Sequence, residues 1–193
     1  MARSLPFAGL ALIVALPAAA DNEAVNPGFV TDLAGWTVLS NPAFTAGHDT
    51  SQSFNSPGSL RVATPGPTPS TLVVVRQCRA VTPGQVLDYG GKYRFESGHA
   101  ANLKGAGGAI WFTDAACAVP APIVAPSTNT VADVANTWLP IHANNVVVPA
   151  GVNSAFFTLS IGTTAAEGVG WFDDVYFGPD PLTPVELTGF AVE

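Results

Sequence analysis

Hydrophobic positions along the chain form short runs separated by Gly, Pro and Asn, without helical repeats over several turns. An amphipathic helix would need apolar residues at i, i+3, i+4 and i+7, so the pattern predicts strands. The runs are rich in Val, Ile, Thr and aromatic residues, which favour strands. Eight strands are predicted, at 36–39, 59–63, 72–81, 93–97, 109–113, 138–148, 155–161 and 170–177.

Eight or more short strands separated by turns predict an all-β protein, an antiparallel β-sandwich with jelly-roll topology. Two proline-rich stretches, 65–69 and 119–126, are expected to be loops, because proline cannot donate a backbone hydrogen bond to a sheet. The glycine cluster 105–108 is also expected to be a loop, since no helix with nucleotide-binding spacing follows it.

Two adjacent acidic residues lie in the last predicted strand. Strict alternation divides its side chains between two faces: Phe172, Asp174 and Tyr176 on one, and Trp171, Asp173, Val175 and Phe177 on the other. One carboxylate is therefore expected to point inward or toward a sheet end. Because an unpaired buried carboxylate is costly, it needs a cation or several hydrogen-bond donors.

The N-terminus has the three-part pattern of a secretory signal peptide: Arg3, an apolar stretch at 10–16 and small residues at 18–20. We expect residues 1–20 to be the signal peptide, 21–178 the sandwich domain and 179–193 a tail without an assigned role. The alternative for 1–20 is an uncleaved anchor, although the apolar stretch is short for a membrane span. The predicted location is secreted or periplasmic.

Composition and charge fit a compact acidic protein. Hydrophobic residues make up 48% of the chain and charged residues 11%, which argues against disorder. The formal net charge is −7; without Arg3 it becomes −8, from 6 basic and 14 acidic residues. An acidic chain without a basic stripe argues against nucleic acid as a partner.

The two cysteines, Cys78 and Cys117, are expected to form a disulfide, because an exported even pair is usually oxidised. A metal pair or a catalytic thiol would need a suitably spaced His or second thiol, which the sequence lacks. A bridge closing about 40 residues would stabilise the fold by about 3–4 kcal/mol.

A series of motifs runs through residues 26–178. Asn26-Pro27-Gly28-Phe29 opens it and Trp171-Phe172-Asp173-Asp174-Val175 closes it; between them come 77–84, 109–114 leading to Cys117, 136–138 with the turn 148–151, and 155–161. In this order the motifs resemble the carbohydrate-binding-module-like jelly rolls (the CBM4/9/22 type), galactose-binding-like sandwiches of secreted bacterial proteins. The resemblance implies a non-catalytic module that binds a polysaccharide or surface glycan through one sheet face.

Sugar recognition requires a flat aromatic ring together with polar groups for the hydroxyls. With Ile110 and Phe112 in the core, Trp111 would lie on the opposite, open face. With Tyr93 and Phe95 inward, Arg94 and Glu96 would point outward. Trp111, Arg94, Glu96 and Gln77 are therefore the candidate sugar-binding residues, although the apolar run 72–75 does not fix which side Arg76 and Gln77 occupy. Trp36, Trp138 and Trp171 are better explained as core or strand-end residues.

Many domains of the resembled family hold a structural Ca²⁺ where the first and last strands meet, using an acidic residue from each. Here Val30 stands where the first glutamate would be. Asp173 is the best candidate ligand and Asp174 the second; Asp32 and Asp49 could add oxygens if their loops reach the site, since Ca²⁺ takes six to eight. The alternative is that Asp173 or Asp174 only accepts hydrogen bonds from a neighbouring turn.

No catalytic set is predicted. Asp173 and Asp174 would point apart and cannot flank one glycosidic bond. The histidines, His48, His99 and His142, have no metal-ligand spacing, and there is no Gly-x-Ser-x-Gly motif. Two alternatives remain open: an extracellular structural or adhesive sandwich without a sugar site, and a glycan-active hydrolase.

Overall fold

The computed structural model describes residues 22–67, 72–96, 104–128, 136–162 and 167–179. Ten strands occupy these ranges: β1 (Thr37–Val38), β2 (Thr45–Asp49), β3 (Ser59–Thr64), β4 (Leu72–Ala80), β5 (Val86–Phe95), β6 (Lys104–Phe112), β7 (Pro120–Ser127), β8 (Leu139–Val147), β9 (Ser154–Gly162) and β10 (Gly168–Pro179). The described ranges contain no helix that is long and apolar enough to span a membrane. The predicted signal peptide, and the predicted tail beyond Pro179, lie outside the described residues.

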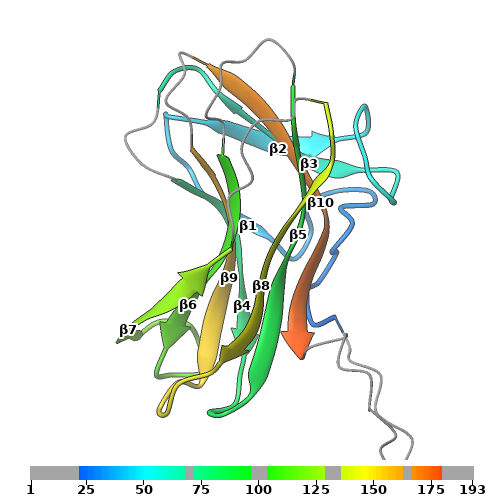
Figure 1. Cartoon of the computed structure of the whole chain (residues 1–193). Coiled ribbons are helices and arrows are strands. Elements are labelled where there is room, and N and C mark those ends of the chain that lie inside the picture. The colour runs from blue at the N-terminus through cyan, green and yellow to red at the C-terminus, as the bar shows by residue number, and fades with distance from the viewer. Residues whose placement is uncertain (1–21, 68–71, 97–103, 129–135, 163–166, 180–193) are drawn as a thin grey trace, which may run out of the picture.

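The strands form two five-stranded sheets that stack face to face (Figure 1). Sheet A has the order β1-β4-β9-β6-β7, and sheet B has the order β2-β3-β10-β5-β8. Every pair of neighbouring strands is antiparallel. The predicted antiparallel β-sandwich is therefore confirmed, and each of the eight predicted runs overlaps a strand.

Two loop predictions are wrong. The proline-rich stretch 119–126 contains most of β7, and the glycine cluster 105–108 lies inside β6. Proline is tolerated in β7 because this strand is at the edge of sheet A and pairs only with β6, through an irregular ladder. Strand β2 was not predicted, because its sequence Thr-Ala-Gly-His-Asp has no apolar alternation.

Aromatic side chains fill the space between the sheets. Phe157 from sheet A stacks on Phe177 from sheet B with ring centroids 5.4 Å apart, and Tyr93 packs on Phe172 at 4.9 Å. All four are fully or almost fully buried. The Phe157–Phe177 pair contributes to the contact area that joins the two sheets, whereas Tyr93 and Phe172 are cross-strand neighbours on the inner face of sheet B.

Strand β10 contains a bulge that breaks the predicted alternation. Its register with β5 shifts between Asp173 and Tyr176, and Asp174 has a φ of 49°. The extra residue brings Phe172, Val175 and Phe177 all into the core, so the predicted opposition of Phe172 to Val175 and Phe177 is wrong. Strict alternation fails here because one residue has no partner across the ladder.

The N-terminal segment lies along β10, as the order of motifs predicts. The backbone N–H of Glu23 donates to the carbonyl of Phe177, and that of Val175 donates to Pro27. Phe29 is fully buried and packs against Trp36 at 5.4 Å. The opening motif is a turn and not a strand.

The predicted disulfide is confirmed. Cys78 of β4 and Cys117 of the β6–β7 turn are bonded, with Cα atoms 6.0 Å apart. Asp114 shapes this turn because its carboxylate accepts hydrogen bonds from the backbone N–H groups of Ala116, Ala118 and Val119. These bonds hold the pKa of Asp114 below its usual range.

Candidate functional site

The four predicted sugar-binding residues do not share one surface. Arg94 lies on the outer face of sheet B, and Glu96 is exposed directly after β5. Gln77 belongs to sheet A and is buried, with its amide donating to the carbonyl of Val25 at 2.6 Å and accepting from the Val25 N–H at 3.0 Å. It ties the N-terminal segment to β4.

The predicted orientation of Trp111 is wrong. Its side chain is 1% exposed and points between the sheets, whereas Ile110 is 41% exposed on the outer face. The reason is the register with β9, which places Trp111 opposite the small Ala155 in the core and Ile110 opposite Phe156 outside. The sequence does not reveal this orientation, because the four residues 109–112 are all apolar. Whichever face of the strand points inward, two of them are buried.

The inward prediction for Tyr93 and Phe95 is confirmed, since both are 2% exposed or less. Trp36 lies in the core and Trp138 directly before β8, as predicted for core or strand-end residues. Trp171 is 4% exposed but lies on the outer face of sheet B. There the guanidinium of Arg94 covers its ring at 5.2 Å.

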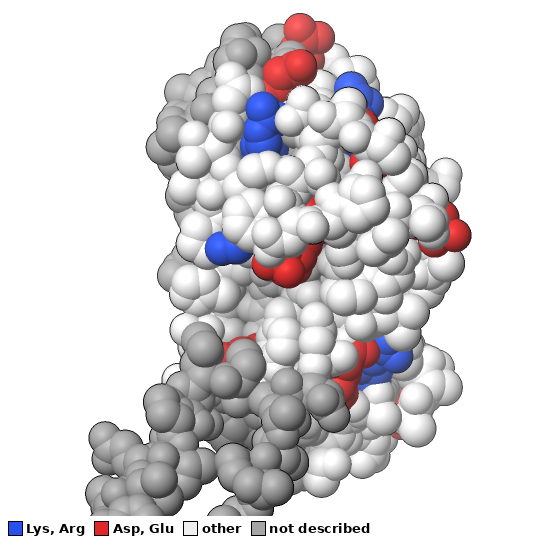
Figure 2. Space-filling model, turned by 90° about the vertical axis from the view of Figure 1, so that its right-hand side faces the viewer, with Lys and Arg blue, Asp and Glu red and all other residues white. Residues whose placement is uncertain are grey.

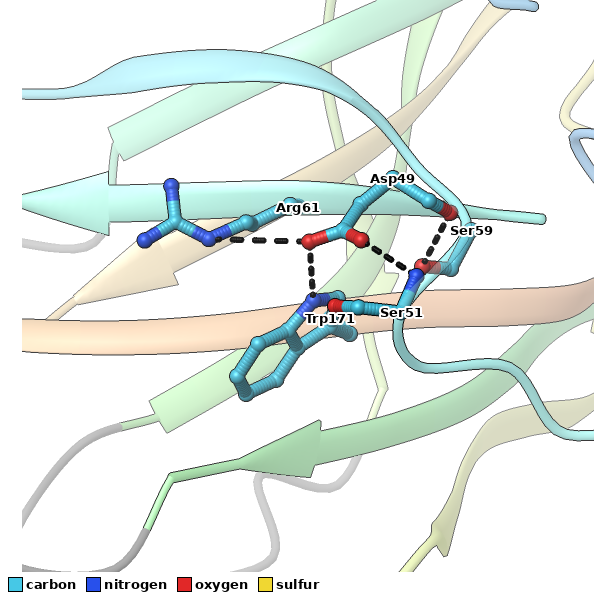
Figure 3. Close-up of polar contacts among 5 residues, drawn as sticks. All are labelled: Asp49, Ser51, Ser59, Arg61 and Trp171. Atoms are coloured by element: carbon cyan, nitrogen blue, oxygen red, sulfur yellow. Dashed lines mark hydrogen bonds and ion pairs between the residues drawn. The ribbon is translucent and has the colours of Figure 1, made fainter.

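Asp49, Ser51, Ser59, Arg61 and Trp171 form a polar network on that outer face (Figure 3). One oxygen of the Asp49 carboxylate accepts from the Trp171 indole at 3.1 Å and lies 3.7 Å from Nε of Arg61. The other accepts from the backbone N–H of Ser51 at 2.6 Å. Partial burial would raise the pKa of Asp49, but these hydrogen bonds and the Arg61 charge outweigh it and hold the pKa below its usual range.

This network fastens β2, β3 and β10 together and leaves the Asp49 carboxylate already occupied. Figure 2 shows the charged groups of this side of the molecule as separate spots on a mostly uncharged surface. The described part of this view has no broad basic area that would attract a phosphate backbone.

Asp173 is fully buried in the β10 bulge. Its carboxylate accepts from the backbone N–H of Phe54 at 2.6 Å, from the Ser56 hydroxyl at 3.0 Å and from the Asp174 N–H at 2.7 Å. The prediction that a buried carboxylate here would need several donors is confirmed. Asp173 is buried beneath the 54–56 loop, however, on the Trp171 side of β10 and not between the sheets, and Asp174 is exposed. The carboxylate holds the 54–56 loop against the last strand.

The predicted Ca²⁺ site stays a prediction. Within the described residues, no three His, Cys, Asp or Glu side chains gather in a group that could hold a metal ion. Asp32 is joined to Asn26 in the N-terminal loop, and Asp49 belongs to the network around Trp171. A Ca²⁺ ion at Asp173 would therefore depend on backbone and hydroxyl oxygens for most of its ligands.

The outer face of sheet A carries an arrangement that the sequence analysis missed. The guanidinium of Arg76, on β4, lies 4.1 Å above the ring of Phe156, on the neighbouring β9. Phe112 meets the same ring edge-on at 4.9 Å, and Ile110 lies beside it on β6. We call Arg76, Ile110, Phe112, Phe156 and Thr158 the Arg76 face.

Arg76 has no acidic partner among the described residues, whose one ion pair joins Arg61 to Asp49. Its Nε atom is buried and makes no hydrogen bond. The pair with Phe156 fixes the plane of the guanidinium while its charge stays unpaired. The sequence could not place Arg76, because a register shift between Val73 and Val75 resets which residues of β4 point outward.

Neither a sequence family nor a curated protein matches the chain. Several solved structures share its fold at low sequence identity. TmCBM61, solved with β-1,4-galactotriose, is 16% identical over 83% of this chain and 99% of its own, with a TM-score of 0.53. The CBM22-2 xylan-binding domain of Paenibacillus barcinonensis Xyn10C is 13% identical over 80% of this chain and 98% of its own, with a TM-score of 0.55.

The CBM22-1–GH10 modules of Clostridium thermocellum endo-1,4-β-D-xylanase 10B, solved with xylohexaose, are 15% identical to this chain. The match covers 83% of this chain and 29% of that one, with a TM-score of 0.59. The chain thus has the jelly-roll fold of carbohydrate-binding modules. At these identities the likeness concerns the fold, and function has to be argued from the site.

Proposed function

We propose that this protein is a secreted, non-catalytic carbohydrate-binding protein that binds a polysaccharide or surface glycan on the Arg76 face. The observation that carries the proposal is Arg76, stacked on Phe156 with its charge unpaired, on the outer face of a sheet in a carbohydrate-binding-module fold. Solved structures of that fold include complexes with galactotriose and xylohexaose.

The chemistry of the face suits a sugar. Phe156 and Ile110 offer apolar surface to the C–H side of a pyranose ring, and Ile110 is 41% exposed. The guanidinium of Arg76 offers several N–H donors in one plane to hydroxyl oxygens.

The fold offers a matched pair of variants. Arg76 stacks on Phe156 in sheet A, and Arg94 stacks on Trp171 in sheet B, so each Arg→Ala change removes one stacked arginine from one outer face. We expect Arg76→Ala to weaken binding about tenfold or more, the loss of hydrogen bonds to a charged donor, while Arg94→Ala leaves it unchanged. Affinity electrophoresis through gels containing xylan, galactan, β-glucan or mannan measures both.

The outcomes separate the alternatives. If Arg94→Ala and not Arg76→Ala reduces retention, the ligand face is the outer face of sheet B, where Arg94, one of the four predicted sugar-binding residues, lies. If the protein is not retained on any polysaccharide, the proposal is wrong and the structural or adhesive role is favoured. If the protein released reducing sugar from a polysaccharide that retards it in the gel, this would contradict the non-catalytic role.

A further inference from the structure

A cavity lies at the open side of the sandwich, between the edge strands β7 of sheet A and β8 of sheet B. Its volume is about 460 Å³, within the range of about 300–1,000 Å³ typical of small-molecule sites. Trp111 forms its floor, Pro126 and Ser127 line the β7 side, and His142, Asn144 and Asn145 line the β8 side. We call it the edge cleft.

The edge cleft stays open because β7 cannot pair regularly with another strand. Pro120, Pro122 and Pro126 lack backbone N–H groups, and its ladder with β6 shifts register twice. The hydroxyl of Tyr89, on β5, donates to the carbonyl of Pro126. This bond links sheet B to the edge of sheet A beside the cleft, which defines the separation of its two walls.

The lining contains no Asp, Glu, Lys or Arg among the described residues, which favours an uncharged ligand. Ser127, His142 and the two asparagines carry groups that both donate and accept hydrogen bonds, as hydroxyl-rich ligands require. Two valines on opposite sides of the opening are unusually exposed, Val124 by 93% and Val147 by 59%. Apolar side chains beside neutral polar groups match the two sides of a sugar ring.

We propose that the edge cleft is a second carbohydrate site, which takes a short neutral oligosaccharide separately from the Arg76 face. The inference extends the proposed function and rests on the same class of ligand. A peptide added as an extra strand fits less well, because the prolines of β7 remove donors from one wall.

The cleft has a natural extension. Across β8, on the outer face of sheet B, a hollow of about 230 Å³ shares His142 and Asn144 with the cleft and is otherwise lined by Asp88, Tyr89, Gly90, Gly91 and Tyr176. The Asp88 carboxylate there accepts a hydrogen bond from the backbone N–H of Asn145 at 2.7 Å. A sugar chain that lies in the cleft can therefore continue across β8, with its next ring beside Tyr176.

NMR of the tryptophan indole N–H groups tests the proposal, because the Trp111 side chain lines the cleft and points to the side of β6 opposite the Arg76 face. The probes are xylotriose, cellotriose, mannotriose and β-1,4-galactotriose, titrated into isotope-labelled protein. We expect at least one of these trisaccharides to shift the Trp111 signal, with a dissociation constant in the millimolar range, about 1–10 mM. Trp111→Phe identifies the signal.

Variants then locate the site. Asn144→Ala should weaken the Trp111 shift about threefold to tenfold, and Ser127→Phe, which fills the cleft, should abolish it. Asn55→Ala, an exposed asparagine outside the cleft, is the matched control and should change nothing. Arg76→Ala should leave the shift intact, which separates this site from the proposed sheet-face site.

The proposal is overturned if no trisaccharide moves the Trp111 signal, even when a polysaccharide binds the Arg76 face in electrophoresis. It is also overturned if the shift survives Ser127→Phe. A Trp111 signal that moves with protein concentration and without sugar would show that a second copy of the chain occupies the cleft instead.

Discussion

At the scale of single residues, the carboxylates act mainly as fixed hydrogen-bond acceptors. Asp173 holds the 54–56 loop, and Asp49 joins Arg61 to the Trp171 indole (Figure 3). The sequence predicted that one of the two neighbouring carboxylates, Asp173 or Asp174, would point inward or toward a sheet end, because alternation forces two neighbours apart. It could not predict that Asp49 meets Trp171, since 122 residues separate them.

Because the pKa of Asp49 is lowered in the folded protein, we expect its contribution to the free energy of unfolding to depend on pH. A group with a depressed folded-state pKa stabilises the fold above its unfolded pKa, about 3.9, and this contribution is lost as pH falls through the folded pKa. Asp49→Asn should cost about 1–3 kcal/mol at pH 7. The difference in unfolding free energy between wild type and variant should be constant above about pH 4 and shrink below it.

Urea unfolding followed by tryptophan fluorescence between pH 7 and pH 2 measures this difference. If the difference in unfolding free energy between wild type and Asp49→Asn stayed constant down to pH 2, the network would not stabilise the ionised form of Asp49. Asp174→Asn serves as a control at an exposed carboxylate, where the change should be small.

At the scale of elements, close strand contacts decide where glycine is required. Gly90 in β5 has a φ of 154°, and a Cβ built there would lie 1.8 Å from the carbonyl oxygen of Ile141 on β8. The sequence shows the pair Gly90-Gly91 but not the reason for it. That reason is the neighbouring strand, which only the sheet order provides.

Gly90→Ala should therefore destabilise the protein by about 3 kcal/mol or more, because the clash is with backbone that cannot move aside. Gly47→Ala in β2 is the matched control, since a Cβ there meets nothing within 4 Å. Thermal unfolding of both variants measures the difference. Equal melting temperatures for the two would contradict the close approach of β5 and β8.

At the scale of the whole molecule, the two ends of the described chain and one disulfide hold the sandwich together. The N-terminal segment runs beside β10, and the Cys78–Cys117 bond joins β4 to the turn after β6. The N-terminal segment also contributes Ala24 and Phe29 to the hydrophobic core between the sheets.

Replacing both cysteines, as Cys78→Ser with Cys117→Ser, should lower the free energy of unfolding by about 3–4 kcal/mol, the chain-entropy effect of opening a loop of 39 residues. Binding at the edge cleft should survive at temperatures where the variant remains folded. Urea unfolding of the variant and of the reduced wild type should agree. A loss below about 1 kcal/mol would show that the bridge contributes little beyond the packed core.

The sequence by itself determined the strand content, the sandwich architecture and the disulfide, because short β-rich runs, turn residues and an even cysteine pair are local or compositional signals. It did not determine which side of each strand faces out. Two bulges, in β4 and β10, reset the alternation, and the register of β6 on β9 turned Trp111 inward.

The surfaces proposed for binding were decided by the tertiary structure alone. The Arg76 face depends on the diagonal contact of two neighbouring strands, and the edge cleft depends on how far apart two edge strands of different sheets lie. Both arise from pairings between residues far apart in the chain. Local pattern cannot encode such pairings, because the same alternating run fits either face until its partner strands are in place.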